Sequence, residues 1–551
     1  MAALPPFVDT RIDALDEIYD RLQATLDTNK TLDIAYRNYN LKQLYFLLTD
    51  NEERIQASLK ADLDKAGFDA NVGDIWPVIN QIALAIKRLP QWMKPESASK
   101  DASTMFKLMR PRVVKQPKGV SLIISAWNYP WQLALGPLVG AIAAGCPAVI
   151  KMSEHSPASA ALMEELIPRY LDPEAYAVVN GGVAQTTILL QKQWGHIMYT
   201  GSGMVGKIVA SAAAKTLTPT TLELGGKSPV IVAPDADVKI GARRILSMKS
   251  LNLGQVCVAP DYILVAKERV DDFVKAIVET MDEFFPRGSE RSFVKDGAYA
   301  CIRNERDYER IVSLVDDQDA KGQLVYRAEA DEKRRRIGIN VVHLPKDGAG
   351  EQGLLVTDEI FGPILPIMAV DVCSVEAAIK YVNARPHPLA LYVLSKNRSY
   401  FDKVIHETLS GSAIWNDVAF TPVATTLPFG GVGDSGWGNY HGVHGFNTFS
   451  HHKAILEVPY WLELAQKSRY PPNLDASARK VFKMFMVSKI NFKRPVSVEG
   501  EQQLLRSQRN RRTLYLGALL IFLGAWAGII GRQGAEKFGS VGGWLKAKFN
   551  V

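Results

Sequence analysis

Helical periodicity dominates the start of the chain, from about Ile12 to Leu89. Charged and apolar residues follow one another there with a spacing of three to four, as in the stretch DALDEIYDRLQATL. This spacing places the apolar side chains on one face of a helix. The pattern therefore predicts a long helical lead-in ahead of the first strand.

Short β-rich runs alternate with helical segments after this lead-in. The first strand candidates are VSLIISA, PAVIKM, AYAVVN and HIMYT, separated by segments such as QLALGPLVGAIAAG. A second series begins near Ser228, with strand candidates SPVIVA, DYILVA, GQLVYR, INVVHL and ILPIMAV. Strands that alternate with helices build parallel βαβ units, so the pattern predicts an α/β fold with two α/β domains.

An uncharged run, LYLGALLIFLGAWAGII, occupies residues 514–530 and is flanked by Arg511, Arg512 and Arg532. Its length lies at the lower edge for a membrane-spanning helix, whereas a buried core helix usually has a shorter apolar run. We expect a transmembrane helix at 513–531, followed by a short basic tail at 532–551. A buried core helix is the alternative.

The net charge of +7 is unevenly distributed along the chain. Residues 466–512 carry a net +9, whereas residues 1–465 sum to −5. Nucleic-acid binding would require basic residues interleaved with aromatic ones on a folded module, and here they border an apolar run instead. We therefore expect no nucleic-acid partner, and a basic connector at 466–512 that lies against anionic lipid.

The four cysteines, Cys146, Cys257, Cys301 and Cys373, form no CxxC pair. This spacing predicts neither a metal site nor a disulfide framework. The N-terminus contains acidic residues and has no apolar segment typical of a secretory signal. Both observations favour a reducing compartment.

A glycine-rich segment, TGSGMVG, follows the strand candidate HIMYT and precedes a helix candidate. Gly201, Gly203 and Gly206 have the GxGxxG spacing that lets a backbone approach a pyrophosphate at a helix N-terminus. A glycine-rich turn without a ligand is the alternative. Glu223, about twenty residues on, has two interpretations: the acid that binds a ribose, or a partly desolvated general base.

Other candidates carry little information singly. Cys257 lies in LNLGQVCVAPDY, where Gly254 and Pro260 predict a loop. A lone cysteine is more often a small buried hydrophobic residue than a nucleophile. Asn128 in SAWNYPW and Glu359 in DEIFGP are likewise uninformative in isolation.

Taken together, seven segments resemble the aldehyde dehydrogenase superfamily, in its order, over about residues 10–460. They are AWNYPW, VIKMSE, TGSxxVGK, LELGGKSP, GQVCVAPDY, EIFGP and PFGGVGDSGWGNYHG. The chain is most similar to the class-3 branch, which includes the fatty aldehyde dehydrogenases. The resemblance implies a Rossmann-type cofactor domain at 1–224 with an oligomerisation hairpin at about 97–114, a catalytic domain at 225–424, and a bridging segment at 425–465.

The resemblance also implies roles for individual residues. Cys257 matches the nucleophile that forms a thiohemiacetal with the aldehyde, whose oxyanion the Asn128 amide and the Cys257 N–H would hold. Glu223 matches the base that activates water to hydrolyse the thioester. The expected cofactor is NAD, with NADP also tolerated. Its contacts would be Lys151 and Glu154 at the adenine ribose, Gly201, Ser202, Gly203 and Gly206 at the pyrophosphate, and Glu359 and Phe429 at the nicotinamide end.

Two positions depart from the family pattern. Met152 stands where the family commonly has proline, which exchanges one apolar residue for another. Val256 stands where threonine is common in this branch, and a hydroxyl beside Cys257 is thereby lost.

We therefore expect NAD(P)-dependent oxidation of medium- or long-chain aliphatic aldehydes to carboxylic acids, with aromatic aldehydes as the alternative. An acyl-transferring reductase is disfavoured because it would not need Glu223. A catalytically silent membrane scaffold is disfavoured because Cys257 and Asn128 are present. The resemblance implies a homodimer. The apolar run and its basic flanks predict that the enzyme is anchored to face the cytosol, on the mitochondrial outer membrane, the endoplasmic reticulum or a lipid droplet.

Overall fold

The computed structural model describes residues 4–295, 297, 299–344, 354–370, 375–463, 470, 476–487, 494 and 496–508. Contacts divide the chain into two compact units, residues 1–100 with 110–457 and residues 101–109 with 458–551. The expected helical lead-in is confirmed, but several helices form it instead of one. They are α1 (Ala14–Asp27), α2 (Ile34–Asp50), α3 (Glu52–Leu63), α4 (Gly67–Ala70), the π-helical turn η2 (Asn71–Ile75) and α5 (Trp76–Met93).

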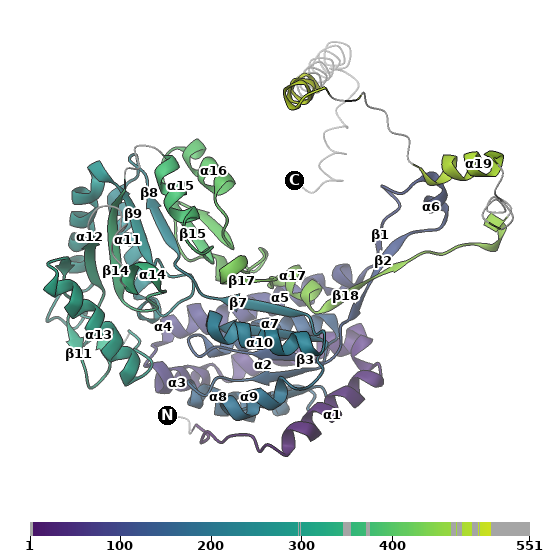
Figure 1. The fold of residues 1–551 in the computed structure, drawn as a ribbon. Coiled ribbons are helices and arrows are strands. Elements are labelled where there is room, and N and C mark those ends of the chain that lie inside the picture. The colour runs from purple at the N-terminus through teal and green to yellow at the C-terminus, as the bar shows by residue number, and fades with distance from the viewer. Residues whose placement is uncertain are drawn as a thin grey trace, which may run out of the picture. The chain divides into compact units, whose positions relative to one another are not determined.

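The first of two large sheets in the larger unit has the strand order β17-β7-β6-β3-β4-β5. All its pairs are parallel except the one that β17 makes with β7. Its inner strands are buried apolar runs, as expected for a sheet covered on both faces. The strands are β3 (Ser121–Ile124), β4 (Ala148–Lys151), β5 (Tyr176–Val179), β6 (His196–Gly201), β7 (Thr220–Leu224) and β17 (Gly436–Trp437). The helices between them are α7 (Pro130–Ala144), α8 (Pro157–Tyr170), α9 (Val183–Leu189) and α10 (Gly203–Lys215), visible beside the sheet in Figure 1.

The second sheet has the order β10-β13-β14-β9-β8-β15-β16, and only β10 is antiparallel to its neighbour. Its strands are β8 (Pro229–Val232), β9 (Tyr262–Ala266), β10 (Leu324–Tyr326), β13 (Asn340–Leu344), β14 (Ile364–Val370), β15 (Ala390–Leu394) and β16 (Ser412–Trp415). Every strand candidate of the second series is confirmed. Its helices are α11 (Val238–Ser250), α12 (Val270–Phe284), α13 (Glu305–Ala320), α14 (Leu354–Thr357), α15 (Val375–Asn383) and α16 (Arg398–Glu407).

A small antiparallel sheet joins β1 (Glu96–Ser97), β2 (Arg112–Pro117) and β18 (Ser450–Ile455). Strands β1 and β2 lie at the ends of the hairpin expected at about 97–114, and the short helix α6 (Thr104–Leu108) lies between them in the sequence. In the smaller unit, Met105, Met109 and Leu462 form a local apolar cluster. Farther along the chain, this unit contains the helix α19 (Ala476–Met486) and helical residues at 498–508.

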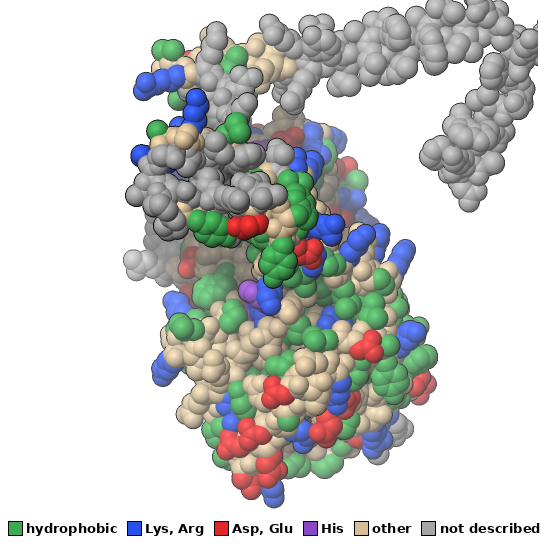
Figure 2. All heavy atoms as spheres, turned by 90° about the vertical axis from the view of Figure 1, so that its right-hand side faces the viewer, with side chains coloured by type: hydrophobic (Ala, Val, Ile, Leu, Met, Phe, Trp, Pro, Cys, Tyr) green, Lys and Arg blue, Asp and Glu red, His purple; other side chains and the backbone are tan. Residues whose placement is uncertain are grey.

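The transmembrane helix expected at 513–531 lies outside the described residues. Among the residues that the structure does describe, none of the helices combines the length and apolarity needed to cross a bilayer. On the face seen in Figure 2, Lys and Arg side chains of the larger unit are interspersed with acidic and apolar ones. Among the described residues of that face, the basic side chains form no continuous patch.

Candidate active site

The carboxyl ends of parallel strands in the first sheet bring several candidates to one edge. Asn128 follows β3, Lys151 ends β4, Gly201 ends β6, and Glu223 is the penultimate residue of β7. Open α/β sheets bind ligands at this edge because loops and helix N-termini converge there. Ser202 caps α10, since its hydroxyl accepts a hydrogen bond from the Val205 N–H at 3.5 Å.

The Cys257 loop comes from the other sheet, between α11 and β9. Three successive residues, Asn252, Leu253 and Gly254, have left-handed backbones, with φ of 46°, 49° and 71°. A side chain at Gly254 would approach the Gly362 carbonyl oxygen to 2.7 Å, so this turn requires glycine. The turn leads directly into Gln255, whose carbonyl accepts a hydrogen bond from the Asn128 side-chain amide at 3.1 Å.

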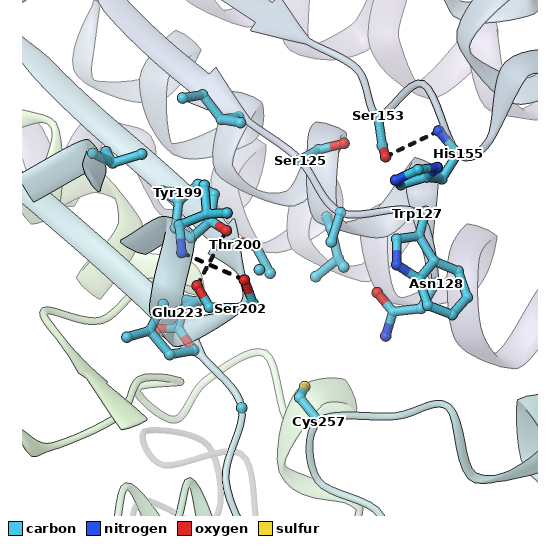
Figure 3. Close-up of a pocket in the computed structure, with 18 of the residues that line it drawn as sticks. Ser125, Trp127, Asn128, Ser153, His155, Tyr199, Thr200, Ser202, Glu223 and Cys257 are labelled. Carbon is cyan, nitrogen blue, oxygen red and sulfur yellow. Dashed lines mark hydrogen bonds between the residues drawn. The ribbon is translucent and has the colours of Figure 1, made fainter. Parts of the chain in front are cut away.

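Two cavities meet at Cys257. The larger, about 570 Å³, is lined by Asn128, Glu223, Cys257, Glu359 and further polar and apolar residues. Figure 3 shows Cys257, Asn128 and Glu223 arriving from separate segments around this cavity. The second cavity is narrow, about 70 Å³, and none of the described residues that line it is charged. Asn128, Leu133, Cys257 and Phe429 line both.

Burial dominates the electrostatics around the thiol. It raises the pKa of Cys257, and the carboxyl groups of Glu359 and Glu223 add to this effect because they disfavour a second negative charge. Burial also raises the pKa of Glu223 well above the usual range of a carboxyl group. Neither carboxyl oxygen of Glu223 has a hydrogen-bond partner among the described residues. A raised pKa makes the ionised carboxylate of Glu223 a stronger base than an ordinary glutamate.

The segment that carries Glu359 is held by a partly buried lysine, Lys227. Lys227 pairs with Asp261 and donates to the carbonyls of Leu355 and Asp358, both at 2.9 Å. Asp261 in turn accepts the Ile360 N–H at 2.9 Å. Burial, reinforced by Asp261, raises the pKa of Glu359 to about 8. Its Oε1 atom is buried without a partner in the described part of the chain, which fits a role in binding ribose hydroxyl groups.

The larger cavity also has charged side chains on its wall. Lys151 and Glu154 form an ion pair of 3.2 Å on its wall, with the carboxylate of Glu154 partly exposed. Gly201 and Ser202 line the cavity, but Gly203 and Gly206 do not. Gly206 instead permits close packing of α10, because an added side chain would approach Leu224 Cδ2 to 2.7 Å.

The structure adds residues that the sequence patterns did not single out. Arg303 lines the larger cavity, pairs with Asp307 at 2.6 Å, and lies 4.7 Å from the centre of the Trp127 ring. Trp127 precedes Asn128 in the AWNYPW segment, so its presence at the site could have been predicted from that motif. Arg303 and Asp307 lie in no motif. Among the described residues, no cluster of three or more side chains suited to a metal ion occurs.

Comparisons with known proteins agree on one family. Residues 9–455 match the sequence profile of the "Aldehyde dehydrogenase family". "Aldehyde dehydrogenase family 3 member A2" of Rattus norvegicus is 40% identical over 88% of this chain and 95% of that protein. "Aldehyde dehydrogenase, dimeric NADP-preferring" of the same organism is 39% identical over 84% and 98%. The solved structure "Substrate bound state of Staphylococcus Aureus AldH" superposes with a TM-score of 0.80 at 35% identity, over 86% of this chain and all of that one.

Proposed function

The chain belongs to the aldehyde dehydrogenase family, in its class-3 branch, and on that premise we propose that it oxidises medium- or long-chain aliphatic aldehydes to carboxylic acids. Members of this family are oxidoreductases that use NAD or NADP. The observation that carries the substrate class is the narrow cavity at Cys257, whose described lining bears no charge. An aliphatic chain that enters this cavity is removed from water, and no charged side chain is desolvated by its entry.

Cys257 begins the proposed reaction. After the Cys257 thiol has released its proton to solvent, the thiolate attacks the aldehyde carbon, a carbon–sulfur bond forms, and the carbonyl electron pair moves to oxygen to give a thiohemiacetal anion. The Asn128 amide and the Cys257 backbone N–H donate hydrogen bonds to this oxyanion. Asn128 is 4% exposed, so its hydrogen bond acts in a site from which water is largely excluded.

Glu223 completes the cycle. NAD(P), held by residues that line the larger cavity, would supply the hydride acceptor, and loss of the hydride from the former aldehyde carbon would leave a thioester on Cys257. Once Glu223 has released its proton to solvent, its carboxylate takes a proton from water as the water oxygen attacks the thioester carbon. The carbon–sulfur bond breaks, and the carboxylic acid and the Cys257 thiolate separate.

The residues that we propose to contact the cofactor line the larger cavity. Glu359 would bind the nicotinamide ribose, and Phe429 would pack against that end, supported by the ring of His441 stacked at 5.4 Å. Lys151 and Glu154 would contact the adenine ribose hydroxyl groups. Ser202 and the N-terminus of α10 would face the pyrophosphate, as helix N-termini favour anions.

Cofactor choice gives one prediction. Glu154 should repel a 2′-phosphate, so NAD should be preferred over NADP, and Glu154→Gln should narrow the difference. The ratio of kcat/KM for the two cofactors measures this effect. Because Lys151 remains beside the new amide, we expect a change of about three- to tenfold, in line with one partly screened charge. An unchanged ratio would mean that this carboxylate does not face the ribose.

A chain-length series tests the proposed substrate class. For saturated aldehydes, kcat/KM from NADH absorbance should rise about fourfold for each added CH₂ until the apolar cavity is filled, since each buried CH₂ contributes about 0.8 kcal/mol. Benzaldehyde serves as the aromatic comparison. A flat series would contradict an aliphatic preference, and turnover that requires an added thiol acceptor would favour the acyl-transferring alternative.

The relative whose name describes it as dimeric supports a homodimer for this chain as well. The candidate elements are the hairpin at about 97–114 and the strand after Phe449, both in the small antiparallel sheet. Strand β18 pairs with β2 on one side only, so within the described residues its other edge is open for pairing.

We further propose that residues 513–531 anchor the enzyme in a membrane, with the basic connector on the cytosolic side. Alkaline carbonate extraction of the full chain should leave it in the membrane pellet. Deletion of residues 506–551 should move it to the soluble fraction, with kcat on short, water-soluble aldehydes nearly unchanged. Extraction of the full chain into the supernatant would show that the segment does not span the bilayer.

A further inference from the structure

A buried ion pair lies beneath the site. Lys65, between α3 and α4, and Asp74, in the π-helical turn η2, have fully buried side chains, and Lys65 Nζ lies 3.0 Å from Asp74 Oδ2. Such a pair adds little net stability, because the cost of removing both charges from water offsets their attraction. π-helical turns are also rare and are frequent at functional sites. The pair therefore calls for a role beyond stability.

Both members of the pair bind the segment that carries Asn128. Lys65 Nζ donates to the Asn128 main-chain carbonyl at 2.7 Å and lies 3.7 Å from the centre of the Tyr129 ring. Asp74 Oδ1 accepts the N–H groups of Trp131 at 3.1 Å and Gln132 at 3.4 Å, in the first turn of α7. The backbone is thus fixed at Asn128 itself and again at Trp131 and Gln132, three and four residues later.

A second donor closes the network around Asn128. The Asn252 side-chain amide donates to the Asn128 carbonyl at 3.0 Å and to the Gln255 carbonyl at 3.2 Å. The Asn128 amide donates to the same Gln255 carbonyl at 3.1 Å. One N–H of the Asn128 amide is thereby used to set its orientation, and the other is available to an oxyanion beside Cys257.

We propose that Lys65 is a positioning residue of the oxyanion site, and that it acts by holding the Asn128 carbonyl together with Asp74 and Asn252. The inference rests on the proposed function, because it takes the Asn128 amide as the donor to the thiohemiacetal anion. Lys65 itself does not touch the substrate or the reacting atoms. Its effect is transmitted through the orientation of one amide.

The test is a double-mutant cycle between Lys65 and Asn128. Asn128→Ala should lower kcat/KM about 10²- to 10³-fold, as for the loss of one oxyanion donor. Lys65→Met should lower it about 10- to 100-fold, and the double variant should be no worse than Asn128→Ala alone, because the two residues act as one unit. If the loss of kcat/KM in the double variant equalled the product of the two single losses, the residues would act independently and the proposal would be overturned.

A second readout separates positioning from general distortion. Alkylation of Cys257 by iodoacetamide requires the thiolate but forms no oxyanion, so its rate in Lys65→Met should stay within about twofold of the wild type. If alkylation and aldehyde turnover fall together, Lys65 merely supports the Cys257 loop and the proposal fails. The variant Lys65→Met with Asp74→Asn removes both charges, and it replaces the single variant if an unpaired buried carboxylate prevents folding.

The matched control is Arg37→Met. Arg37 is also a buried cation, and it donates to the Ala143 carbonyl at 2.9 Å, at the opposite end of α7. This variant should lower the thermal midpoint without changing kcat/KM; a comparable loss of turnover would make the Lys65 effect non-specific and overturn the proposal. If Asn128→Ala keeps full turnover, the oxyanion role of Asn128 fails and the Lys65 proposal with it. If only Lys65→Met keeps full turnover, the proposed function stands and the positioning role alone is wrong.

Discussion

Replacing Cys257 with serine should reduce aldehyde oxidation to below about a hundredth of the wild-type kcat. A hydroxyl is a weak nucleophile unless a base activates it, and burial of this position makes an anion there still harder to form. NAD binding should change by no more than a few-fold, because the sulfur atom forms only a small part of the cavity wall. NADH formation and fluorescence titration of NAD measure the two effects.

Cys146→Ser is the control for this substitution. Cys146 is fully buried, and its thiol donates to the Phe449 carbonyl at 3.3 Å, a bond that a hydroxyl can also make. Because Cys146 lines neither cavity at the site, its variant should keep normal turnover. If Cys257→Ser retained more than about a tenth of kcat, another residue would have to be the nucleophile.

Glu223→Gln should stop the cycle after hydride transfer. One equivalent of NADH per site should appear in a burst, and turnover should then cease, since thioester hydrolysis needs the base whereas thioester formation does not. We expect this substitution to change the stability of the fold only slightly. Burial raises the pKa of Glu223 and thereby favours the neutral carboxyl form, which a neutral amide of the same shape resembles, so the thermal midpoint should shift little.

Hydroxylamine gives this prediction a second readout. As a nucleophile that needs no base, it should attack the trapped thioester, release a hydroxamate and restore multiple turnovers in Glu223→Gln. Mass spectrometry should find the acyl group on Cys257 before hydroxylamine is added. A variant that shows neither a burst nor an acyl group would place Glu223 earlier in the reaction, in activation of the thiol.

The sequence predicted the fold well where a single pattern of hydrophobic residues extended over a whole helix or strand. The amphipathic lead-in and the buried runs of both sheets were long enough to define their class. It missed β15 and β16. Strand β15 is a five-residue apolar run just after a proline-rich turn. Strand β16, with the sequence SAIW, does not alternate clearly between polar and apolar residues, and none of its four residues is fully buried. Such short runs become strands through pairing with distant neighbours, which periodicity does not encode.

The candidate site followed from motifs, and its supporting residues did not. The segments around Asn128, Glu223, Cys257 and Glu359 were recognised as a set, and all four residues line one cavity. Nothing in the stretch DLDKAGFDA distinguishes the buried Lys65 from a solvated lysine. Its burial depends on Asp74 and on the loop of Asn128, which only the tertiary structure brings together. The GxGxxG spacing also suggested a ligand role for Gly206, which does not line the larger cavity and lies where an added side chain would approach Leu224.

The pairing of β17 with β7 has a consequence for synthesis of the chain. Gly436 lies opposite Glu223, so the strand that carries the base is covered on that edge by a segment made about 200 residues later. At roughly 5–20 residues per second, a ribosome needs about 10–40 s to supply it. During that interval the edge of β7 is unpaired, and unpaired apolar edges promote aggregation. We expect nascent chains that end between β7 and β17 to depend on chaperones, and to be released from them when residues 436–437 have emerged.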